Sequence, residues 1–173
     1  MSSVVANIRP ITETDIALLE KRFQQGGMAK HAERFLRQQK GEAVYLVAWH
    51  RGQPVGHALL KWGGAQDEPV TRQLRVAFPD IEDLFVIAAL RSQGIGSQLI
   101  HFAEQLALER GYTHIGLSVG AKTNEPARRL YGRLGYQEAH FGEYTERGEY
   151  LDPQGQHHTW EDICIYLIKD LRA

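Results

Sequence analysis

The chain has 173 residues, of which 43% are apolar and 24% charged, as in an ordinary globular protein. Lysine plus arginine (20) nearly balance aspartate plus glutamate (21), and a net charge of −1 offers no general attraction to nucleic acid or to an anionic membrane. The only cysteine, Cys164, excludes an internal disulfide and a cysteine-based metal site. The N-terminal ten residues have no signal-peptide pattern, and no apolar run approaches the roughly 18 residues of a membrane span, so we expect a cytoplasmic protein. No linker or repeat divides the chain, which predicts one domain over residues 1–173.

The first half of the chain indicates a strand, two helical stretches, a hairpin and a further strand. Thr12 opens the first helical stretch with Asp15 three residues on, a variant of the capping box, and Gly26-Gly27 interrupt it. The turn at Arg51-Gly52 joins two strands rich in β-branched and aromatic residues. The expected elements are a strand over 4–8, a helix over 29–39, strands over 43–50 and 55–62, a long polar connection over 63–79 and a strand over 81–87.

The second half gives a clearer pattern. Apolar residues recur at steps of four, three and four over 94–110, which is one face of a helix, and Gly111 is placed to end it. Residues 113–119 alternate like a strand, and Asn124 then caps a helix with Pro126 in its first turn. Two more strands are expected over 136–144 and 159–167. Hairpins at both ends and a central strand–helix–strand–helix unit predict an α/β fold with a mixed, mostly antiparallel sheet flanked by helices.

A strand runs through a glycine-containing turn into a helix between Leu84 and Ser97. Gly94 and Gly96 let the main chain approach a ligand, and the first N–H groups of the helix have no internal partner, so the turn suits an anion such as a pyrophosphate. Arg91 supplies a cation at its rim. A glycine pair before a helix is more often simply a tight turn. The third glycine of a dinucleotide fingerprint and the Gly-Lys-Ser/Thr of a P-loop are both lacking.

Three motifs in this region resemble the GNAT superfamily of N-acetyltransferases. Residues 91–96 read Arg-Ser-Gln-Gly-Ile-Gly and match the R/Q-x-x-G-x-G/A motif of that family. Val86, five residues earlier, stands where the family's strand contacts pantetheine. Asn124 and Tyr131, followed by Leu-Gly-Tyr at 134–136, match the family's N-x₆-Y…LG(F/Y) motif. The resemblance covers about 81–136, and the order of elements on either side also agrees.

The resemblance implies acetyl-CoA as co-substrate, with no metal. It implies that Phe85 and Val86 pair with pantetheine through their main chain and that the Val86 N–H polarises the thioester carbonyl. It also implies that Asn124 bonds to pantetheine and that Tyr131 stands next to the sulfur. The pyrophosphate would be held at the glycine turn, by Arg91, Ser92, Gln93, Gly94, Ile95, Gly96 and Ser97.

Acetyl transfer to an amine needs a base, because an alkylamine with a pKa near about 10.4 is protonated at neutral pH. It also needs a donor for the oxyanion and an acid for the departing thiolate, and the phenol of Tyr131 suits the latter unless it merely lines its helix. Asp80 and Glu82 share a strand face and are the candidate bases, with Asp83 a close competitor. Asp80 corresponds to the acidic position that some family members use, while Ser118 replaces the glutamate of others. A water relay, or a simple solvated strand entry, stays open.

The sequence therefore predicts an acetyl-CoA-dependent N-acetyltransferase that acts by direct attack on a primary amine of a small molecule or peptide, through a tetrahedral intermediate. A non-catalytic acyl-CoA sensor and a nucleotide-binding protein are the alternatives. Cys164 has no evident histidine partner, so a covalent route has little support. Nucleic acid and membranes are not expected partners, and a homodimer is the default expectation.

Three other features bear on the acceptor. The segment 138–162 carries seven acidic residues against Arg147 alone, which is either a solvated face or a rim that favours a cationic acceptor. The pair His157-His158 is expected in a solvated loop rather than at a metal, because adjacent strand residues point to opposite faces. Gly26-Gly27 and the connection 63–79 are candidate borders of the acceptor pocket.

Overall fold

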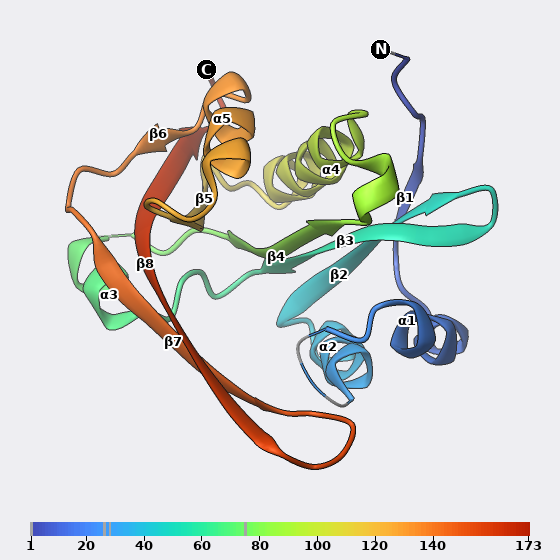
Figure 1. Ribbon diagram of the computed structural model, residues 1–173. Helices are drawn as coiled ribbons and strands as arrows, with labels where there is room; N and C mark the ends of the chain where they lie inside the picture. The colour runs from blue at the N-terminus through green and yellow to red at the C-terminus, as the bar shows by residue number, and fades with distance from the viewer. Residues whose placement is uncertain (1, 26, 28, 75) are drawn as a thin grey trace.

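A mixed sheet of eight strands forms the centre of the protein, ordered β1-β2-β3-β4-β5-β8-β6, with β7 paired to β8 (Figure 1). The computed structural model describes residues 2–25, 27, 29–74 and 76–173, so Gly26 of the expected helix break lies outside it. Among the strands of the described residues, only β4 and β5 run parallel, which confirms the mixed, mostly antiparallel sheet. The strands are β1 Asn7–Pro10, β2 Ala43–His50, β3 Gln53–Lys61, β4 Asp80–Val86, β5 His114–Gly120, β6 Gln137–Glu138, β7 Tyr144–Leu151 and β8 His157–Asp170.

Helices cover both faces of this sheet, with α4 and α5 on one side and α1 and α2 on the other (Figure 1). Alternation along β2 shows why: Tyr45 and Val47 pack with Leu19 of α1, whereas Leu46 and Ala48 join the larger core beneath α4. Among the described residues no helix is both long and apolar enough to cross a bilayer. The helices are α1 Ile16–Arg22, α2 Lys30–Gln39, α3 Glu68–Gln73, α4 Ile95–Glu109 and α5 Glu125–Arg133, with short 3₁₀ turns η1 Glu13–Asp15 and η2 Ala88–Leu90.

The helix ends follow the signals in the sequence. Thr12 and Asp15 form the expected capping box ahead of α1. The Asn124 side chain accepts a hydrogen bond from the Ala127 N–H at 3.3 Å and begins α5. Gly135 has a φ of +91°, the left-handed conformation that ends a helix, directly after α5.

The two parallel strands stay together over only two pairs, Asp80 with Gly116 and Ile81 with Leu117. Beyond them β4 continues to Val86 beside β3 alone. Its register with β3 steps from Leu59–Glu82 to His57–Phe85, so β4 carries one extra residue there, a β-bulge. Asp83, within the bulge, has a φ of +52°. The bulge and the parting of the strands expose one edge of β4.

The structure differs from the sequence prediction at the first strand, where β1 spans Asn7–Pro10 and not 4–8, and in two further places. The helix α3 interrupts the connection 63–79, and the strand expected over 136–144 shrinks to β6, while an unexpected β7 begins at Tyr144 and pairs with β8 over eight residue pairs. The β7 sequence Tyr-Thr-Glu-Arg-Gly-Glu-Tyr-Leu is mostly polar, so its strand state depends on cross-strand pairing rather than on propensity. His157 and His158 consequently begin β8 and do not lie in a loop.

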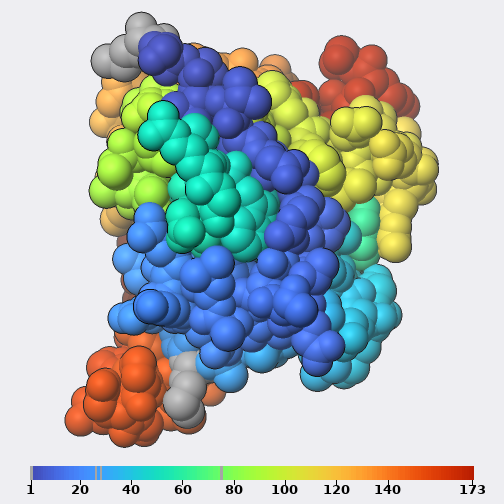
Figure 2. All heavy atoms as spheres, turned by 90° about the vertical axis from the view of Figure 1, so that its right-hand side faces the viewer, coloured from blue at the N-terminus to red at the C-terminus, as the bar shows by residue number. Residues whose placement is uncertain are grey.

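Beyond the body of the sheet, β7 and the outer half of β8 form a two-stranded hairpin. The last β5 residue paired to β8 is Gly120, opposite Cys164. From there the hairpin reaches the loop before α2, where a Cβ on Gly27 would lie 3.0 Å from the Tyr150 Cβ. Figure 2 shows the orange tip projecting past the blue helical part of the molecule.

Candidate active site

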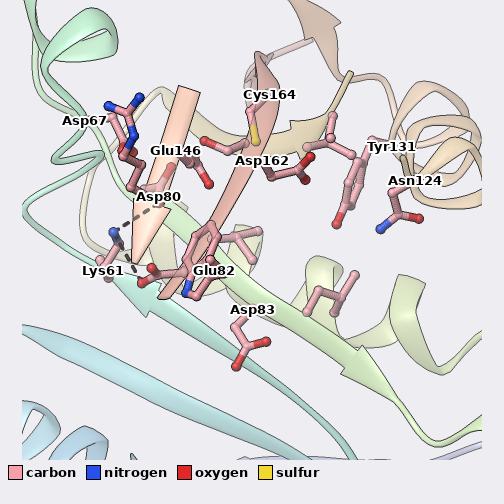
Figure 3. Close-up of a pocket in the computed structure, with 17 residues that line it drawn as sticks. Lys61, Asp67, Asp80, Glu82, Asp83, Asn124, Tyr131, Glu146, Asp162 and Cys164 are labelled. Carbon is pink, nitrogen blue, oxygen red and sulfur yellow. Dashed lines mark ion pairs between the residues drawn. The ribbon is translucent and has the colours of Figure 1, made fainter. Parts of the chain in front are cut away.

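A cavity of about 280 Å³ lies where β4 and β5 part, closed on its remaining sides by the start of α5 and by the β7–β8 hairpin (Figure 3). Six carboxylates line it, and two cationic side chains, Lys61 and Arg147, accompany them. The carboxylates are those of Asp67, Asp80, Glu82, Asp83, Glu146 and Asp162. Acidic side chains therefore outnumber basic ones around the cavity.

Asp80 is the most buried of these acids, at 5% exposed. Its Oδ1 accepts a hydrogen bond from the Tyr166 hydroxyl at 2.8 Å, and its Oδ2 lies 3.5 Å from Lys61 Nζ. Burial raises the pKa of Asp80 to about 7, although Lys61 and the Tyr166 hydroxyl each pull it down. Asp80 can therefore change protonation near neutral pH.

Glu82 shares its strand face with Asp80, as expected, but its side chain is 49% exposed. Lys61 Nζ lies 3.3 Å from its carboxylate and so bridges the two acids. Burial by itself lowers the pKa of Lys61, but both carboxylates outweigh it and the pKa is raised. Lys61 is therefore cationic and neutralises part of the Asp80–Glu82 pair.

Asp83 points away from the other acids, toward α2 (Figure 3). Its Oδ2 accepts a hydrogen bond from Arg34 at 2.8 Å and lies 3.6 Å from Lys30 Nζ. Burial opposes ionisation, but the neighbouring cations prevail and the pKa of Asp83 is lowered. These contacts hold the β4 bulge against α2 and make Asp83 a poor proton acceptor.

Asp83→Asn tolerates the left-handed backbone but removes the charge opposite two mostly buried cations. We expect a loss of about 1–2 kcal/mol in the free energy of unfolding, less than for a fully buried pair because the Asp83 side chain is 39% exposed. Because the folded pKa is lowered, this stabilisation is present above the ordinary value near 4 and disappears as the pH falls through the folded value. Urea unfolding of the wild type and the variant at pH 7 measures the loss of stability, and the same comparison at pH 3 measures how far the loss disappears in acid. The control Glu68→Gln, in an exposed pair with Arg72, should change stability by less than about 0.5 kcal/mol.

The phenol of Tyr131 enters the cavity from α5, next to Asn124 (Figure 3). Tyr131 is 6% exposed, and its ring packs against Tyr136 at 6.0 Å between centroids. Burial raises its pKa to about 12, so it carries its proton at neutral pH. Asn124 uses its Oδ1 for the helix cap, which leaves its Nδ2 as a donor.

The exposed edge of β4 ends at Val86. Ile87 N–H donates to Val55 C=O on β3 at 2.9 Å, and main-chain groups alternate along an antiparallel ladder, so Val86 turns its N–H and C=O to the open side. By the same alternation the main-chain N–H and C=O of Phe85 point toward His57 on β3. Of the two residues expected to bond to pantetheine through their main chain, only Val86 therefore has its polar groups free to do so. The Nε of Arg91 donates to the Val86 carbonyl at 2.9 Å, and its guanidinium lies 5.6 Å from the Phe85 ring centroid.

The glycine turn leaves several main-chain N–H groups unpaired. Ser92 and Gly94 adopt positive φ values of +60° and +89°, so the main chain curls around the start of α4. Within the described part of the chain, the N–H groups from Gly94 through Ser97 have no main-chain acceptor. Val4 N–H bonds to the Gln93 carbonyl at 3.0 Å and fixes the back of the turn.

Sequence reasoning missed several side chains that meet at the cavity from β7 and β8. The hydroxyls of Ser118 and Tyr144 are hydrogen-bonded, and Tyr144 donates in turn to Glu146 Oε1 at 3.3 Å. A glutamate, Glu146, thus lies close to Ser118, but it comes from β7 and not from the strand that carries Ser118. Burial raises the pKa of Glu146. The alternation Trp160, Asp162, Cys164, Tyr166 along β8 could have shown which residues face inward, had β7 been identified.

The acidic run divides between two faces of the hairpin. Glu146 and Asp162 face the cavity. Glu161 bonds to Arg147 at 2.7 Å and Glu149 to His157 at 2.9 Å, so this part is an exposed, paired surface. His158 bonds to Asp152 at 2.8 Å. Among the residues that the structure covers, no group of three or more potential ligands could hold a metal.

Solved structures of other proteins share this fold. An N-acetyltransferase from Staphylococcus aureus superposes with a TM-score of 0.70 at 20% identity, covering 97% of this chain and 99% of that one. A protein of Arabidopsis thaliana solved with acetyl-CoA gives 0.68 at 22% identity, over 98% and 100%. The aminoalkylphosphonate N-acetyltransferase of Salmonella typhimurium is 33% identical over 101 residues, which are 58% of this chain and 54% of that protein. The match thus spans about half the length of this relative.

The family model described as "Acetyltransferase (GNAT) family" matches residues 10–136. This range runs from the end of β1, through the open edge of β4 and the glycine turn, to the last residues of the Asn124–Tyr131 motif. The protein therefore belongs to the acetyltransferase (GNAT) family.

Proposed function

We propose that the protein transfers the acetyl group of acetyl-CoA to a primary amine by direct attack. The observation that carries this proposal is the meeting, in one cavity, of a buried phenol that keeps its proton and a buried carboxyl that can lose one near neutral pH. Amine acetylation uses one proton donor and one proton acceptor, on opposite sides of the reacting carbonyl.

Acetyl-CoA binds along the open edge of β4 in this proposal. The free N–H groups at the start of α4 and the positive end of the helix dipole suit its diphosphate. The outward polar groups of Val86 and the Nδ2 of Asn124 suit the amides of pantetheine. Arg91 donates through its Nε to the Val86 carbonyl, so it must leave that carbonyl before reaching a phosphate.

In the proposed reaction the amine nitrogen attacks the thioester carbonyl, and the oxyanion that forms takes a hydrogen bond from the Val86 N–H. Collapse of the tetrahedral intermediate breaks the C–S bond, and the thiolate receives the proton of Tyr131. Asp80 takes the proton of the amine, directly or through a water molecule, while Glu82 and Lys61 set the charge around it. Burial raises the pKa of Cys164 to about 12, which keeps the thiol protonated and supports direct transfer over a covalent intermediate.

The pH dependence tests the role of Asp80. With an alkylamine acceptor, log kcat/KM should rise with pH and level off above about 7, where Asp80 has lost its proton. In Asp80→Asn the plateau should be absent and the rise should continue toward the pKa of the free amine, about 10. An unchanged profile in the variant would transfer the role to Glu82, Glu146 or water.

Two measurements test the function as a whole. Acetyl-CoA should raise the melting temperature, whereas ATP and NAD should not, because a nucleotide site would respond to the latter pair. Acetyl-CoA consumption should then be detectable with at least one member of an amine panel. Stabilisation by acetyl-CoA without turnover of any amine would favour the acyl-CoA sensor.

An aminoalkylphosphonate is a second candidate acceptor, favoured by the 33% identical relative that is named for this substrate. The acidic lining of the cavity opposes it, because a phosphonate would lie among carboxylates. Including 2-aminoethylphosphonate in the amine panel decides between an aminoalkylphosphonate and an amine without an anionic group as the acceptor.

A further inference from the structure

The inner wall of the β7–β8 hairpin carries acids whose charge is unmatched. Side chains alternate along a strand, and Glu146 and Asp162, together with Trp160, face the cavity. Glu146 and Asp162 are direct cross-strand partners. Like charges directly opposite each other destabilise a sheet, so a chain selected only for folding would avoid this pair.

The outer face of the same hairpin shows the contrast. There Arg147 and Glu161 are cross-strand partners of opposite charge, and the Glu149 carboxylate lies 2.9 Å from His157 Nε2, diagonally across the ladder. On the inner face, Glu146 accepts a hydrogen bond from Tyr144, and Asp162 accepts from Thr123 at 3.2 Å. Among the described residues no ion pair joins either acid to a cation, because Arg147, the cationic side chain of the hairpin that also lines the cavity, is paired to Glu161. The repulsion is therefore confined to the wall that meets a ligand.

An aromatic side chain completes this wall. Trp160, two residues before Asp162 on the same face, stands opposite Gly148, and its indole lies where a side chain at 148 would be: a Cβ there would come within 2.4 Å of it. Trp160 remains 46% exposed, so the ring is available to a ligand. An indole beside two carboxylates is a chemical setting that binds ammonium groups.

The acids on β4 form a different group. Asp80 and Glu82 share Lys61, which supplies the cation that Glu146 and Asp162 lack. The Tyr166 hydroxyl adds a further hydrogen bond to Asp80. The cavity thus has one acidic group whose charge is partly balanced, where we place the reacting amine, and a second whose charge is not.

We propose that Glu146, Asp162 and Trp160 bind a second ammonium group of the acceptor, which makes the acceptor an aliphatic diamine or a longer polyamine. This inference rests on the proposed function. One amine reacts near Asp80 as a free base, and the other stays protonated against the hairpin wall throughout. The β7–β8 hairpin thereby favours acceptors that carry a second positive charge.

Steady-state kinetics with a matched pair of acceptors test the proposal. The wild type should acetylate 1,4-diaminobutane with a kcat/KM at least about tenfold above that for butylamine, and 4-aminobutyrate should be poorer than both. Asp162→Asn should remove most of this preference through KM for the diamine and change kcat/KM for butylamine by less than about twofold, and Glu146→Gln should lower the preference in the same direction. Trp160→Leu should act in the same direction. The control Glu149→Gln makes the same charge change on the outer face and should leave the preference intact.

Equal use of diaminobutane and butylamine, or a preference that survives in both acid variants, would overturn this inference while leaving N-acetylation in place. Failure with every amine would instead count against the proposed function. In that case calorimetric titration of 1,4-diaminobutane into the protein with bound CoA still tests whether the hairpin wall binds an ammonium group. Binding that weakens at least about tenfold in Asp162→Asn supports the site, and no binding to the wild type refutes it.

Discussion

Tyr131→Phe is expected to lower kcat by about 100-fold, within the range that general acid catalysis contributes, while leaving the Kd for acetyl-CoA unchanged. Burial keeps this phenol protonated up to a pKa of about 12, and phenylalanine fills the same space next to Tyr136 without a proton to give. Steady-state rates with a saturating amine, together with calorimetric titration of acetyl-CoA, separate the two quantities.

A second tyrosine provides the control for this substitution. Tyr112 stacks on Trp62 at the far end of α4, outside the cavity, so Tyr112→Phe removes a phenol without touching the site. Its kcat should stay within about twofold of the wild type. If Tyr131→Phe turned over as fast as Tyr112→Phe, the leaving thiolate would have to be protonated by another group.

Gly116→Ala should damage both stability and catalysis, because Tyr166 lies across this glycine. An added Cβ would be 2.3 Å from the phenol oxygen and 2.6 Å from the adjoining ring carbon, so the ring must move. Overpacking of this kind costs about 1–3 kcal/mol in the free energy of unfolding. Moving the ring also withdraws the hydroxyl that bonds to Asp80.

The catalytic effect of Gly116→Ala has a definite sign. Burial raises the pKa of Asp80, and the hydrogen bond from Tyr166 counteracts it, so losing that bond moves the pKa above its present value of about 7. The rise of kcat/KM should therefore shift to higher pH, with at least about a tenfold loss at pH 7. Tyr166→Phe should give the same pH shift with less destabilisation.

Gly63→Ala serves as the matched control, because nothing lies within 4 Å of a Cβ at Gly63. Urea unfolding and pH–rate profiles of the three variants are the measurements. A Gly116→Ala enzyme with the stability and profile of Gly63→Ala would show that Tyr166 does not set the proton affinity of Asp80.

The sequence was most informative where local chemistry determines the structure. Asn124 was identified as a helix cap from its position before a proline, and the alternation of 113–119 gave β5 within one residue. The family motif placed Tyr131 at the cavity, which helix periodicity alone could not distinguish from ordinary core packing.

Long-range pairing explains what was missed. The strand β7 has little apolar alternation, and it is a strand because β8 lies beside it. The acidic run 138–162 was a candidate rim of the acceptor site, but without β7 neither the pairing of Glu146 with Asp162 nor the side of the hairpin they face could be anticipated. The bulge at Asp83 was equally hidden, since it depends on where β3 pairs and on two cations from α2. Tyr166 lies in the strand expected over 159–167, and only the fold brings it to Asp80, 86 positions away.

The hairpin has a consequence for how the molecule fluctuates. Past Cys164, β8 no longer pairs with β5, so each rung farther out is held by a two-stranded ladder, which is marginally stable by itself. Amide hydrogen exchange should thus become faster rung by rung from Ile163 to the tip, through local openings that leave the central strands protected. The wall that bears Asp162 can then swing outward to admit or discharge a ligand, without disturbing the part of the sheet that holds Asp80.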